Sequence, residues 1–282
     1  MNNLLSDIQQ NINSYSKSQK KIAKFIMEQY DKAAFMTAQK LGNEVGVSES
    51  TVVRFANTLG YEGFPELQED LREIAKNKLT TLQRYELMLE KLGNKDILSK
   101  VINSDISNLK STLEQIDKED FDIAVETILH SDKIYVLGVR SSSSLASFFG
   151  FYLNLLFENV KLVSSTSASE MFEQILKVKE GDVVIGITFP RYSRRTVKAL
   201  EYAKSQGASI IGITDTPQSP ITHCSDISLY AKSSMVSFVD SLVAPLSLIN
   251  ALIVAIGMKK KGEITDTFNN LEKIWGEYNV YN

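Results

Sequence analysis

Five short apolar runs constrain the fold of this chain more than any other feature of its sequence. Each run is separated from the next by a longer stretch with helical spacing; the runs are Ile134–Leu137, Val160–Val163, Val183–Ile187, Ile210–Ile213 and Ile227–Tyr230. Strands that are apolar on both faces and alternate with helices are typical of a parallel sheet covered on both sides. The sequence therefore predicts a doubly wound α/β domain over residues 123–265.

Residues 1–77 have a different texture, because their apolar residues recur at helical spacing alone. Stripes at i, i+3, i+4 or i+7 predict amphipathic helices; they are Ile22, Phe25 and Ile26, then Ala38, Leu41 and Val45, then Val52, Phe55 and Leu59, then Leu67, Leu71 and Ile74. Residues that begin or end helices stand between the stripes, namely Thr37, Gly46, Ser48, Gly60 and Pro65. An all-helical N-terminal domain is expected here.

Residues 78–122 connect the two predicted domains. The stretch 76–95 is polar, is interrupted by Gly93, and is expected to be a partly helical linker. A helical stripe then runs from Leu98 to Leu113 and is expected to pack on the second domain or to pair with a partner chain. Residues 266–282 are expected to form a C-terminal helix or tail.

Charge and residue counts exclude several classes of function. A net charge of −3 gives no overall basic field, so any cationic footprint for nucleic acid must be local; Lys17, Lys20, Lys21, Lys24, Lys40 and Arg54 form one. One cysteine, Cys224, and two distant histidines provide neither a disulfide nor a metal site. No metal and no cofactor are therefore expected.

The N-terminal residues lack the basic start and apolar core of a signal peptide. The apolar segment Leu242–Met258 is too short for a bilayer and contains Pro245 and Asn250, which favours a helix in a core or an oligomer interface. We therefore expect a cytoplasmic protein that does not enter a membrane.

Residues 38–57 have the features of a helix-turn-helix. Gly42 lies where a second helix must approach closely, and Gly46 permits the positive φ of a turn. Ser48 is suited to cap the second helix by accepting a backbone N–H. The outer face of that helix is then polar, and its expected DNA contacts are Ser48, Glu49, Ser50, Thr51, Arg54 and Asn57, with Lys40 from the first helix. The alternative is a plain helical hairpin with a solvated outer face.

Three hydroxyl-rich loops follow the first three predicted strands. They run from Gly138 to Ser144, from Ser164 to Glu170 and from Thr188 to Thr196. Ligands of open parallel sheets bind outside the carboxyl ends of the strands. Hydroxyls, helix N-termini and arginines together favour a phosphate, although each loop taken alone could be ordinary surface. The expected ligand contacts are Arg140, Ser141, Ser142, Ser169, Glu170, Thr188, Arg191, Ser193 and Thr196.

Other chemistries find less support. No glycine-rich dinucleotide loop or Walker loop is present. Ser141 or Ser193 would need a positioned base to act as a nucleophile, and neither histidine is near in sequence. His223 with Glu170 is the remaining candidate for acid–base catalysis in a sugar isomerase.

The chain resembles the RpiR/MurR family of transcriptional regulators, which join a helix-turn-helix to a sugar isomerase (SIS) domain. The resemblance covers nearly the whole chain and rests on residues 48–55, 59–61, 63–64, 138–142, 189–196, 214–215 and 219–220. It implies that Ser142, Ser193 and Thr196 hold a phosphate and that Thr188, Ser169 and Glu170 border the sugar.

Two positions depart from the pattern of many SIS enzymes. Arg140 stands where their first loop has a glycine, and Pro190-Arg191 replaces their usual Ser-Gly. These changes are consistent with binding that is retained while catalysis is lost. The resemblance implies a homodimer or homotetramer that binds a double-stranded DNA operator and responds to a phosphorylated sugar. A phosphosugar isomerase with an accessory helical domain and a protein-interaction module are the alternatives.

Overall fold

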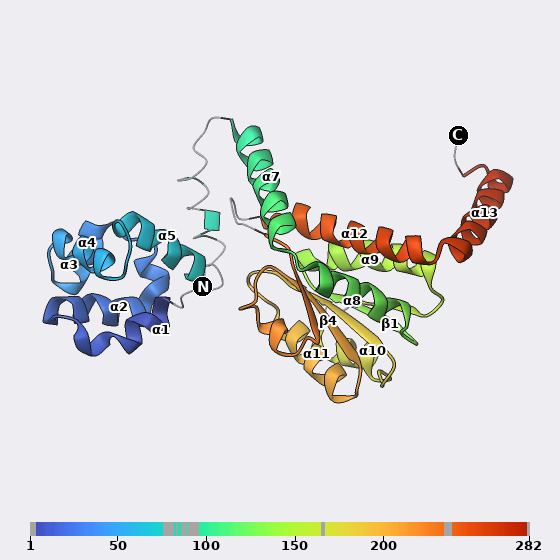
Figure 1. Cartoon of the computed structure of the whole chain (residues 1–282), viewed down its shortest axis with the longest axis horizontal. Coiled ribbons are helices and arrows are strands. Elements are labelled where there is room, and N and C mark those ends of the chain that lie inside the picture. The colour runs from blue at the N-terminus through green and yellow to red at the C-terminus, as the bar shows by residue number, and fades with distance from the viewer. Residues whose placement is uncertain are drawn as a thin grey trace. The chain divides into compact units, whose positions relative to one another are not determined.

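The computed structural model describes residues 4–75, 82, 84–85, 89, 96–164, 167–233 and 239–280. The chain divides into two compact units, Met1–Arg84 and Tyr85–Asn282 (Figure 1). Most of the predicted linker, together with Ser165 and Thr166 of the second predicted loop, lies outside the described residues. The predicted boundaries at residues 77, 122 and 265 therefore remain predictions.

The first unit is all-helical, as expected. Its elements are α1 (Leu4–Gln10), η1 (Ile12–Ser14), α2 (Lys17–Ala33), α3 (Ala38–Val45), α4 (Glu49–Thr58) and α5 (Phe64–Ala75). The predicted stripes supply its core, in which the fully buried residues include Ile22, Ile26, Leu41, Val52, Phe55, Leu67 and Leu71. The rings of Tyr15 and Phe55 meet edge to face with centroids 5.3 Å apart, which ties the start of α2 to α4.

Two glycines set the turn between α3 and α4. A Cβ added to Gly42 would lie 2.8 Å from the carbonyl oxygen of Val47, so the turn can pass α3 only because the side chain is missing. Gly46 has a φ of 70° at the end of α3. Both predictions are confirmed, and they fix how the two helices follow one another.

The second unit contains a five-stranded parallel sheet in the order β2-β1-β3-β4-β5. The strands are β1 (Ile134–Gly138), β2 (Val160–Val163), β3 (Val183–Ile187), β4 (Ser209–Thr214) and β5 (Ile227–Tyr230). All five predicted runs are confirmed as strands. The order reverses direction after β2, so the switch point of the sheet lies between β1 and β3.

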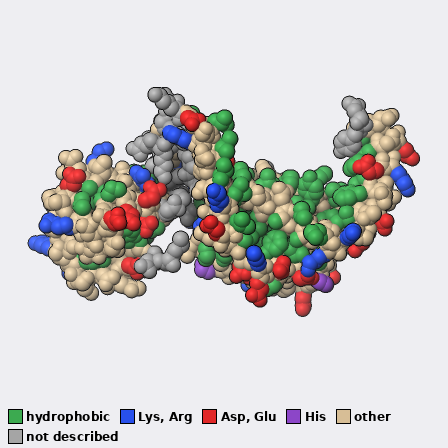
Figure 2. Space-filling model, turned by 45° about the horizontal axis from the view of Figure 1, so that its top comes forward, with side chains coloured by type: hydrophobic (Ala, Val, Ile, Leu, Met, Phe, Trp, Pro, Cys, Tyr) green, Lys and Arg blue, Asp and Glu red, His purple; other side chains and the backbone are tan. Residues whose placement is uncertain are grey.

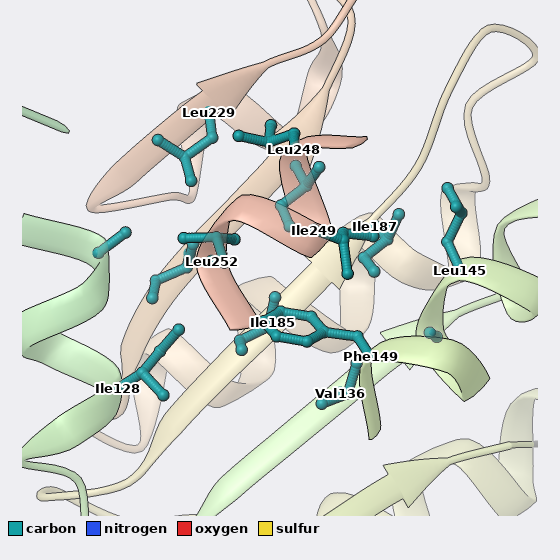
Figure 3. Packing of buried hydrophobic residues seen from close by; sticks show 14 of the residues in the cluster. Ile128, Val136, Leu145, Phe149, Ile185, Ile187, Leu229, Leu248, Ile249 and Leu252 are labelled. Carbon is teal, nitrogen blue, oxygen red and sulfur yellow. The ribbon is translucent and has the colours of Figure 1, made fainter. Parts of the chain in front are cut away.

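Helices cover both faces of the sheet. One face packs against α8 (Lys118–Leu129), α9 (Ser141–Leu156) and α12 (Val243–Lys259), and Figure 3 shows Phe149 and Leu252 among the side chains of this layer. The other face packs against α10 (Ala168–Ile175), α11 (Arg194–Ser205) and η2 (Pro220–His223). The alternation of strand residues between these two cores confirms the predicted doubly wound fold.

The segment considered for a membrane is the core helix α12, in which six residues are buried. In the described part of the chain no single helix is long and apolar enough to cross a bilayer. α12 meets the length and composition required only together with α13 (Lys261–Tyr278), and the pair is bent by 100°. Burial of α12 confirms the expectation of a core helix.

Replacement by alanine is expected to destabilise the first unit at Gly42 but not at Gly63. Gly42→Ala should lower the free energy of unfolding by about 1–3 kcal/mol, because the added methyl overlaps the Val47 carbonyl. Gly63→Ala is the matched control, since its Cβ would meet only the Pro65 ring at an ordinary 3.6 Å. Urea unfolding followed by far-ultraviolet circular dichroism measures both; equal stabilities would contradict the close approach.

Candidate functional site

The outer face of α4 presents a cluster of hydroxyls at the helix start. The hydroxyl oxygen of Ser48 lies 2.9 Å from that of Ser50 and 2.8 Å from that of Thr51. Arg54 Nη2 donates to Thr51 Oγ1 at 3.4 Å, and Ser50 and Arg54 are exposed. This surface combines donors, acceptors and one cation beside a helix N-terminus, as contact with DNA requires.

The predicted N-cap needs a correction. Ser48 precedes α4 as expected, but its hydroxyl accepts no backbone N–H of the helix. It is engaged instead with the two neighbouring hydroxyls. The cap of α3 has the expected form, since Thr37 Oγ1 accepts from the backbone N–H of Lys40 at 3.2 Å.

The turn after α4 ties this helix to α5. The Asn57 amide faces the carbonyl oxygens of Tyr61 and Glu62 and, with its nitrogen on that side, donates to them at 3.2 and 3.3 Å. Tyr61 donates its hydroxyl to Asp70 at 2.6 Å, and burial together with Asp70 raises the pKa of Tyr61 well above its usual value. Asn57 is exposed near the end of α4, so this side chain supports the turn besides its predicted role at DNA.

Several charged side chains of the first unit lie near the helix-turn-helix. Lys40 on α3 and Glu49 at the start of α4 are both exposed. A Cβ on Gly46 would lie 3.7 Å from Lys21 Nζ, so this lysine of α2 reaches the turn itself. Sequence reasoning included Lys21 only in a general basic cluster, because its approach to the turn depends on how α2 packs.

The hydroxyl-rich loops leave the sheet side by side. Gly138 pairs with Ile187 across β1 and β3, and Ile187 pairs with Ile213 across β3 and β4. Leu137 pairs with Val163 across β1 and β2. Neighbouring strands are about 4.8 Å apart, so the first residues of all these loops start in one row. The structure thus brings the predicted loops to one edge, with those after β1 and β3 at the switch point.

The loop after β1 leads directly into α9. A Cβ on Gly138 would lie 2.4 Å from the carbonyl oxygen of Ser142, so this glycine lets the first turn of α9 sit on the strand end. Ser142 is buried, whereas Arg140 and Ser141 are exposed. The spacing of the sequence did not separate Ser142 from its neighbours, because all the serines of this loop have the same chemistry; only the family resemblance singled it out.

The loop after β3 is held by its own polar side chains. Buried Thr188 accepts a hydrogen bond on Oγ1 from the backbone N–H of Ser193 at 3.2 Å. Ser193 caps α11 by accepting from the backbone N–H of Thr196 at 3.3 Å. Thr196 is fully buried, and within the part of the chain that the structure describes its Oγ1 has no hydrogen-bond partner. A buried hydroxyl without a partner is costly and is suited to a ligand oxygen.

A contact to β4 was missed by sequence reasoning. The Tyr192 hydroxyl donates to Asp215 Oδ1 at 2.8 Å and fastens the loop after β3 to the residue that follows β4. Thr214 donates its hydroxyl to Ser219 at 2.7 Å in a buried position. The available signals were the position of Asp215 directly after a strand and the place of residues 189–196, 214–215 and 219–220 in the family resemblance; neither indicated the contact itself.

The loop after β2 contributes exposed side chains. Ser167 accepts from the backbone N–H of Glu170 at 3.2 Å and caps α10. Ser169 and Glu170 lie exposed in the first turn of this helix. Their expected place beside a sugar remains a prediction.

The two arginines that depart from the SIS pattern both have a positive φ, which glycine adopts more readily than other residues. Arg140 has a φ of 57° and Arg191 a φ of 61°. L-residues avoid this region at a cost of about 1–2 kcal/mol. Both side chains are exposed at the edge where the loops meet. The two loops thus combine a positive φ with an exposed cation.

Polar contacts tie the segment after β5 to α7 (Ile97–Gln115). Ala231 donates its N–H to the Thr214 carbonyl at 2.8 Å, and Lys232 donates to Thr112 Oγ1 at 2.8 Å. The Ser241 hydroxyl donates to Asp105 at 2.6 Å. Buried Thr112 and Asn108 face the sheet domain. α7, which follows the predicted linker, is therefore anchored near the same edge that carries the loops.

The remaining candidates for acid–base or thiol chemistry lie on η2, directly after it, and on α10. His223 lies exposed at the end of η2, while Glu170 lies on α10. Cys224 is buried, and burial raises the pKa of its thiol. Among the described residues no group of three or more histidine, cysteine, aspartate or glutamate side chains could hold a metal.

Two family models match this chain, a helix-turn-helix domain of the rpiR family over residues 2–78 and a SIS domain over residues 127–255. This chain belongs to the RpiR family of transcriptional regulators. The matched ranges contain the α3–α4 surface and the sheet edge, so the family assignment and the geometry concern the same residues. This RpiR-family chain is thus a DNA-binding regulator with a SIS domain.

Its relatives carry the same type of name. The RpiR-family chain is 25% identical over 282 residues to an uncharacterized HTH-type transcriptional regulator of Caldanaerobacter subterraneus, which covers 97% of each chain. It is 26% identical over 270 residues to the transcriptional regulator HexR of Pseudomonas aeruginosa, which covers 92% of this chain and 91% of that one. Both of these whole-length relatives are named as transcriptional regulators, which supports a regulatory role.

Solved structures share the fold of the RpiR-family chain. The sugar isomerase domain of an RpiR transcription factor from Sphaerobacter thermophilus matches with a TM-score of 0.60 and 27% identity, covering 63% of this chain and 98% of that one. The Vibrio vulnificus NanR protein, complexed with ManNAc-6P, matches with a TM-score of 0.60 and 19% identity, covering 98% and 99%.

The backbone of Arg191 generates a prediction about stability. Arg191→Gly and Arg191→Ala both remove the guanidinium, but only glycine relieves the positive φ. The glycine variant should unfold with a free energy about 1 kcal/mol higher than the alanine variant. Urea unfolding of the two proteins measures the difference. An alanine variant as stable as the glycine variant would show that the loop carries no such strain.

Proposed function

We propose that this regulator binds an operator through α4 and a phosphorylated sugar at the carboxyl edge of its sheet, with the ligand altering operator affinity. The observation that carries the proposal is the in-register exit of the β1 and β3 loops at the switch point, on a chain that also has a helix-turn-helix. The predicted cytoplasmic location is consistent with binding to DNA and remains part of the proposal.

Three features of the edge support a phosphate. The first turns of α9 and α11 direct backbone N–H groups to the loops, and a helix N-terminus favours an anion. Ser142 and Thr196 supply buried hydroxyls, and Thr196 Oγ1 has no hydrogen-bond partner among the described residues. Arg140 and Arg191 supply exposed positive charge in the same two loops. That NanR was solved with ManNAc-6P on the same fold supports a sugar as the remainder of the ligand.

A route from the ligand to DNA is available through α7. The Tyr192–Asp215 hydrogen bond joins the β3 loop to β4, and the neighbouring Thr214 carbonyl accepts from Ala231. The next residue, Lys232, donates to Thr112 of α7. A ligand that binds more tightly to one of two arrangements of these contacts would increase the population of that arrangement. The position of α7 would change with it. Because α7 follows the linker, that shift is available to the DNA-binding unit.

A homodimer or homotetramer is part of the proposal. The predicted stripe on α7 does not enter the core of its own unit: Leu98 is 72% exposed and Leu113 is 75% exposed. An unpartnered apolar stripe on a helix favours pairing with another chain. Two-fold pairing of regulators would match a palindromic operator.

The deciding experiment is selection of bound DNA by the full chain, repeated with a panel of sugar phosphates. Each sugar phosphate is compared with its unphosphorylated sugar and with inorganic phosphate. The expected result is one preferred DNA sequence whose affinity changes with one or a few sugar phosphates and with neither control. Turnover of a sugar phosphate without ligand-dependent DNA binding would favour the isomerase instead.

Substitution of Arg54 tests the role of α4. Arg54→Ala should weaken operator binding by about 1–3 kcal/mol and relax preference at one base pair if the guanidinium contacts a base. Arg54→Lys keeps the charge but loses the bidentate geometry. Fluorescence anisotropy on operators that differ at single base pairs distinguishes the cases. Full recovery of affinity by lysine, with unchanged preference, would reduce Arg54 to a phosphate contact.

Substitution of Ser193 tests the anion site. Ser193→Ala should lower the affinity for the sugar phosphate while leaving ligand-free operator binding unchanged, because Ser193 lies between Thr188 and the start of α11. Loss of the cap should also cost about 0.5–2 kcal/mol of stability. Ser205→Ala, at the far end of the same helix, is the control. Isothermal titration calorimetry that finds equal affinity for all three proteins would contradict this role.

A further inference from the structure

The first two turns of α2 carry a cluster of positive charge. All four of its cations are exposed lysines; they are Lys17, Lys20, Lys21 and Lys24. The acids of this helix, Glu28 and Asp31, come later, and its first turn has none. Cations near a helix N-terminus oppose the macrodipole, so this charge does not stabilise α2 itself. The cluster therefore gains most from an anion outside the helix.

Most of this charge is not neutralised by the protein. Lys24 pairs with Glu28, with 3.9 Å between Nζ and Oε1. Among the residues that the structure describes, Lys17, Lys20 and Lys21 form no ion pair. Three positive charges of α2 are thus available to an anionic partner.

Side-chain contacts fix the start of α2 against the helix-turn-helix. The Ser16 hydroxyl accepts from the backbone N–H of Gln19, and the Gln19 side chain accepts from the backbone N–H of Ser16, which sets where α2 begins. Gln19 Nε2 also donates to the hydroxyl of Thr58, the last residue of α4, at 3.0 Å. Residues that follow Gln19 therefore have a set position relative to α4.

Lys21 brings its ammonium to the turn between α3 and α4. A Cβ added to Gly46 would lie 3.7 Å from Lys21 Nζ, and Gly46 is exposed. Ser48, two residues beyond Gly46, belongs to the hydroxyl cluster at the start of α4. Lys21 therefore lies at the border of the expected DNA surface, although it belongs to a different helix.

We infer that Lys21 binds a phosphate of the operator backbone beside the turn into α4, which makes α2 a second DNA-contacting helix. The inference rests on the proposed function, because it requires DNA on the outer face of α4. A phosphate contact carries no sequence information, but it fixes the register and orientation of the protein on the duplex. Lys21 would thus position Ser50 and Arg54 over their bases.

The surface of the first unit gives single cations a large effect. Figure 2 shows basic and acidic side chains close together on the visible face of this unit, so no broad basic field covers that face. Electrostatic attraction to DNA comes from the individual phosphates that lysine and arginine neutralise. On a surface of mixed charge, a lysine held at the turn contributes more than a general basic excess.

A structural role is the alternative for Lys21. Gly46 ends α3, and an ammonium near the last carbonyls of a helix stabilises that helix. The two roles differ in what they change. A phosphate contact alters the salt dependence of DNA binding, whereas contact with α3 alters only the stability of the first unit.

The test replaces Lys21 with glutamine in the full chain, which removes the charge and keeps most of the stem. Lys21→Arg retains the charge at the same place. Lys32→Gln removes one charge from an exposed position at the other end of α2 and is the matched control. Fluorescence anisotropy at several salt concentrations measures binding to the duplex obtained by selection and to a scrambled duplex, and urea unfolding measures stability.

The slope of log association constant against log salt concentration should be smaller by about 0.9 per bound chain in Lys21→Gln, the value for one lost phosphate contact. The decrease should be the same for both duplexes. Lys21→Arg and Lys32→Gln should retain the slope of the parent.

Three results would overturn the inference while the proposed function stands: an unchanged slope in Lys21→Gln, whether or not stability falls; an equal decrease in Lys32→Gln; or a loss of affinity confined to the selected duplex. A parent that binds neither duplex would instead overturn the proposed function and the inference together.

Discussion

Parallel pairing of β1 with β3 is the constraint on which the rest of the second unit depends. Because Gly138 and Ile187 are in register, the loops that follow them must start as neighbours. The helices behind those loops then lie on opposite faces, α9 on one and α11 on the other, and both begin at the same edge. Hydroxyls, helix amides and arginines converge there through topology alone, before any specific contact between the loops is made.

The order and type of the helices and strands could be predicted from the sequence. The contacts of single side chains were harder to predict. Runs such as Val183–Ile187 are apolar throughout, short and rich in β-branched residues, which favours strands buried on both faces, so the sheet could be predicted. Gly42 and Gly46 likewise identified the turn before α4. The hydroxyl of Ser48 could not be assigned, because in a short polar helix start it has several competing partners, and it bonds to other hydroxyls instead of capping.

Contacts between distant segments were the least predictable. Tyr192 and Asp215 meet because β3 and β4 are neighbours, and nothing local to either residue indicates the bond. The same holds for Thr112 of α7 with Lys232, which are 120 positions apart. The positive φ of Arg140 and Arg191 was also hidden, since arginine normally gives no signal of a left-handed backbone. The one hint was the departure of both positions from the glycine expected from the family resemblance.

Burial of Cys224 separates this regulator from the redox state of its surroundings. The thiolate is the form that reacts with oxidants and disulfides, and burial raises the pKa of this thiol and keeps it from solvent. No second cysteine exists in the chain to complete an internal disulfide. Thiol chemistry at Cys224 is therefore disfavoured, and no disulfide within the chain can alter the sheet edge or the DNA-binding face.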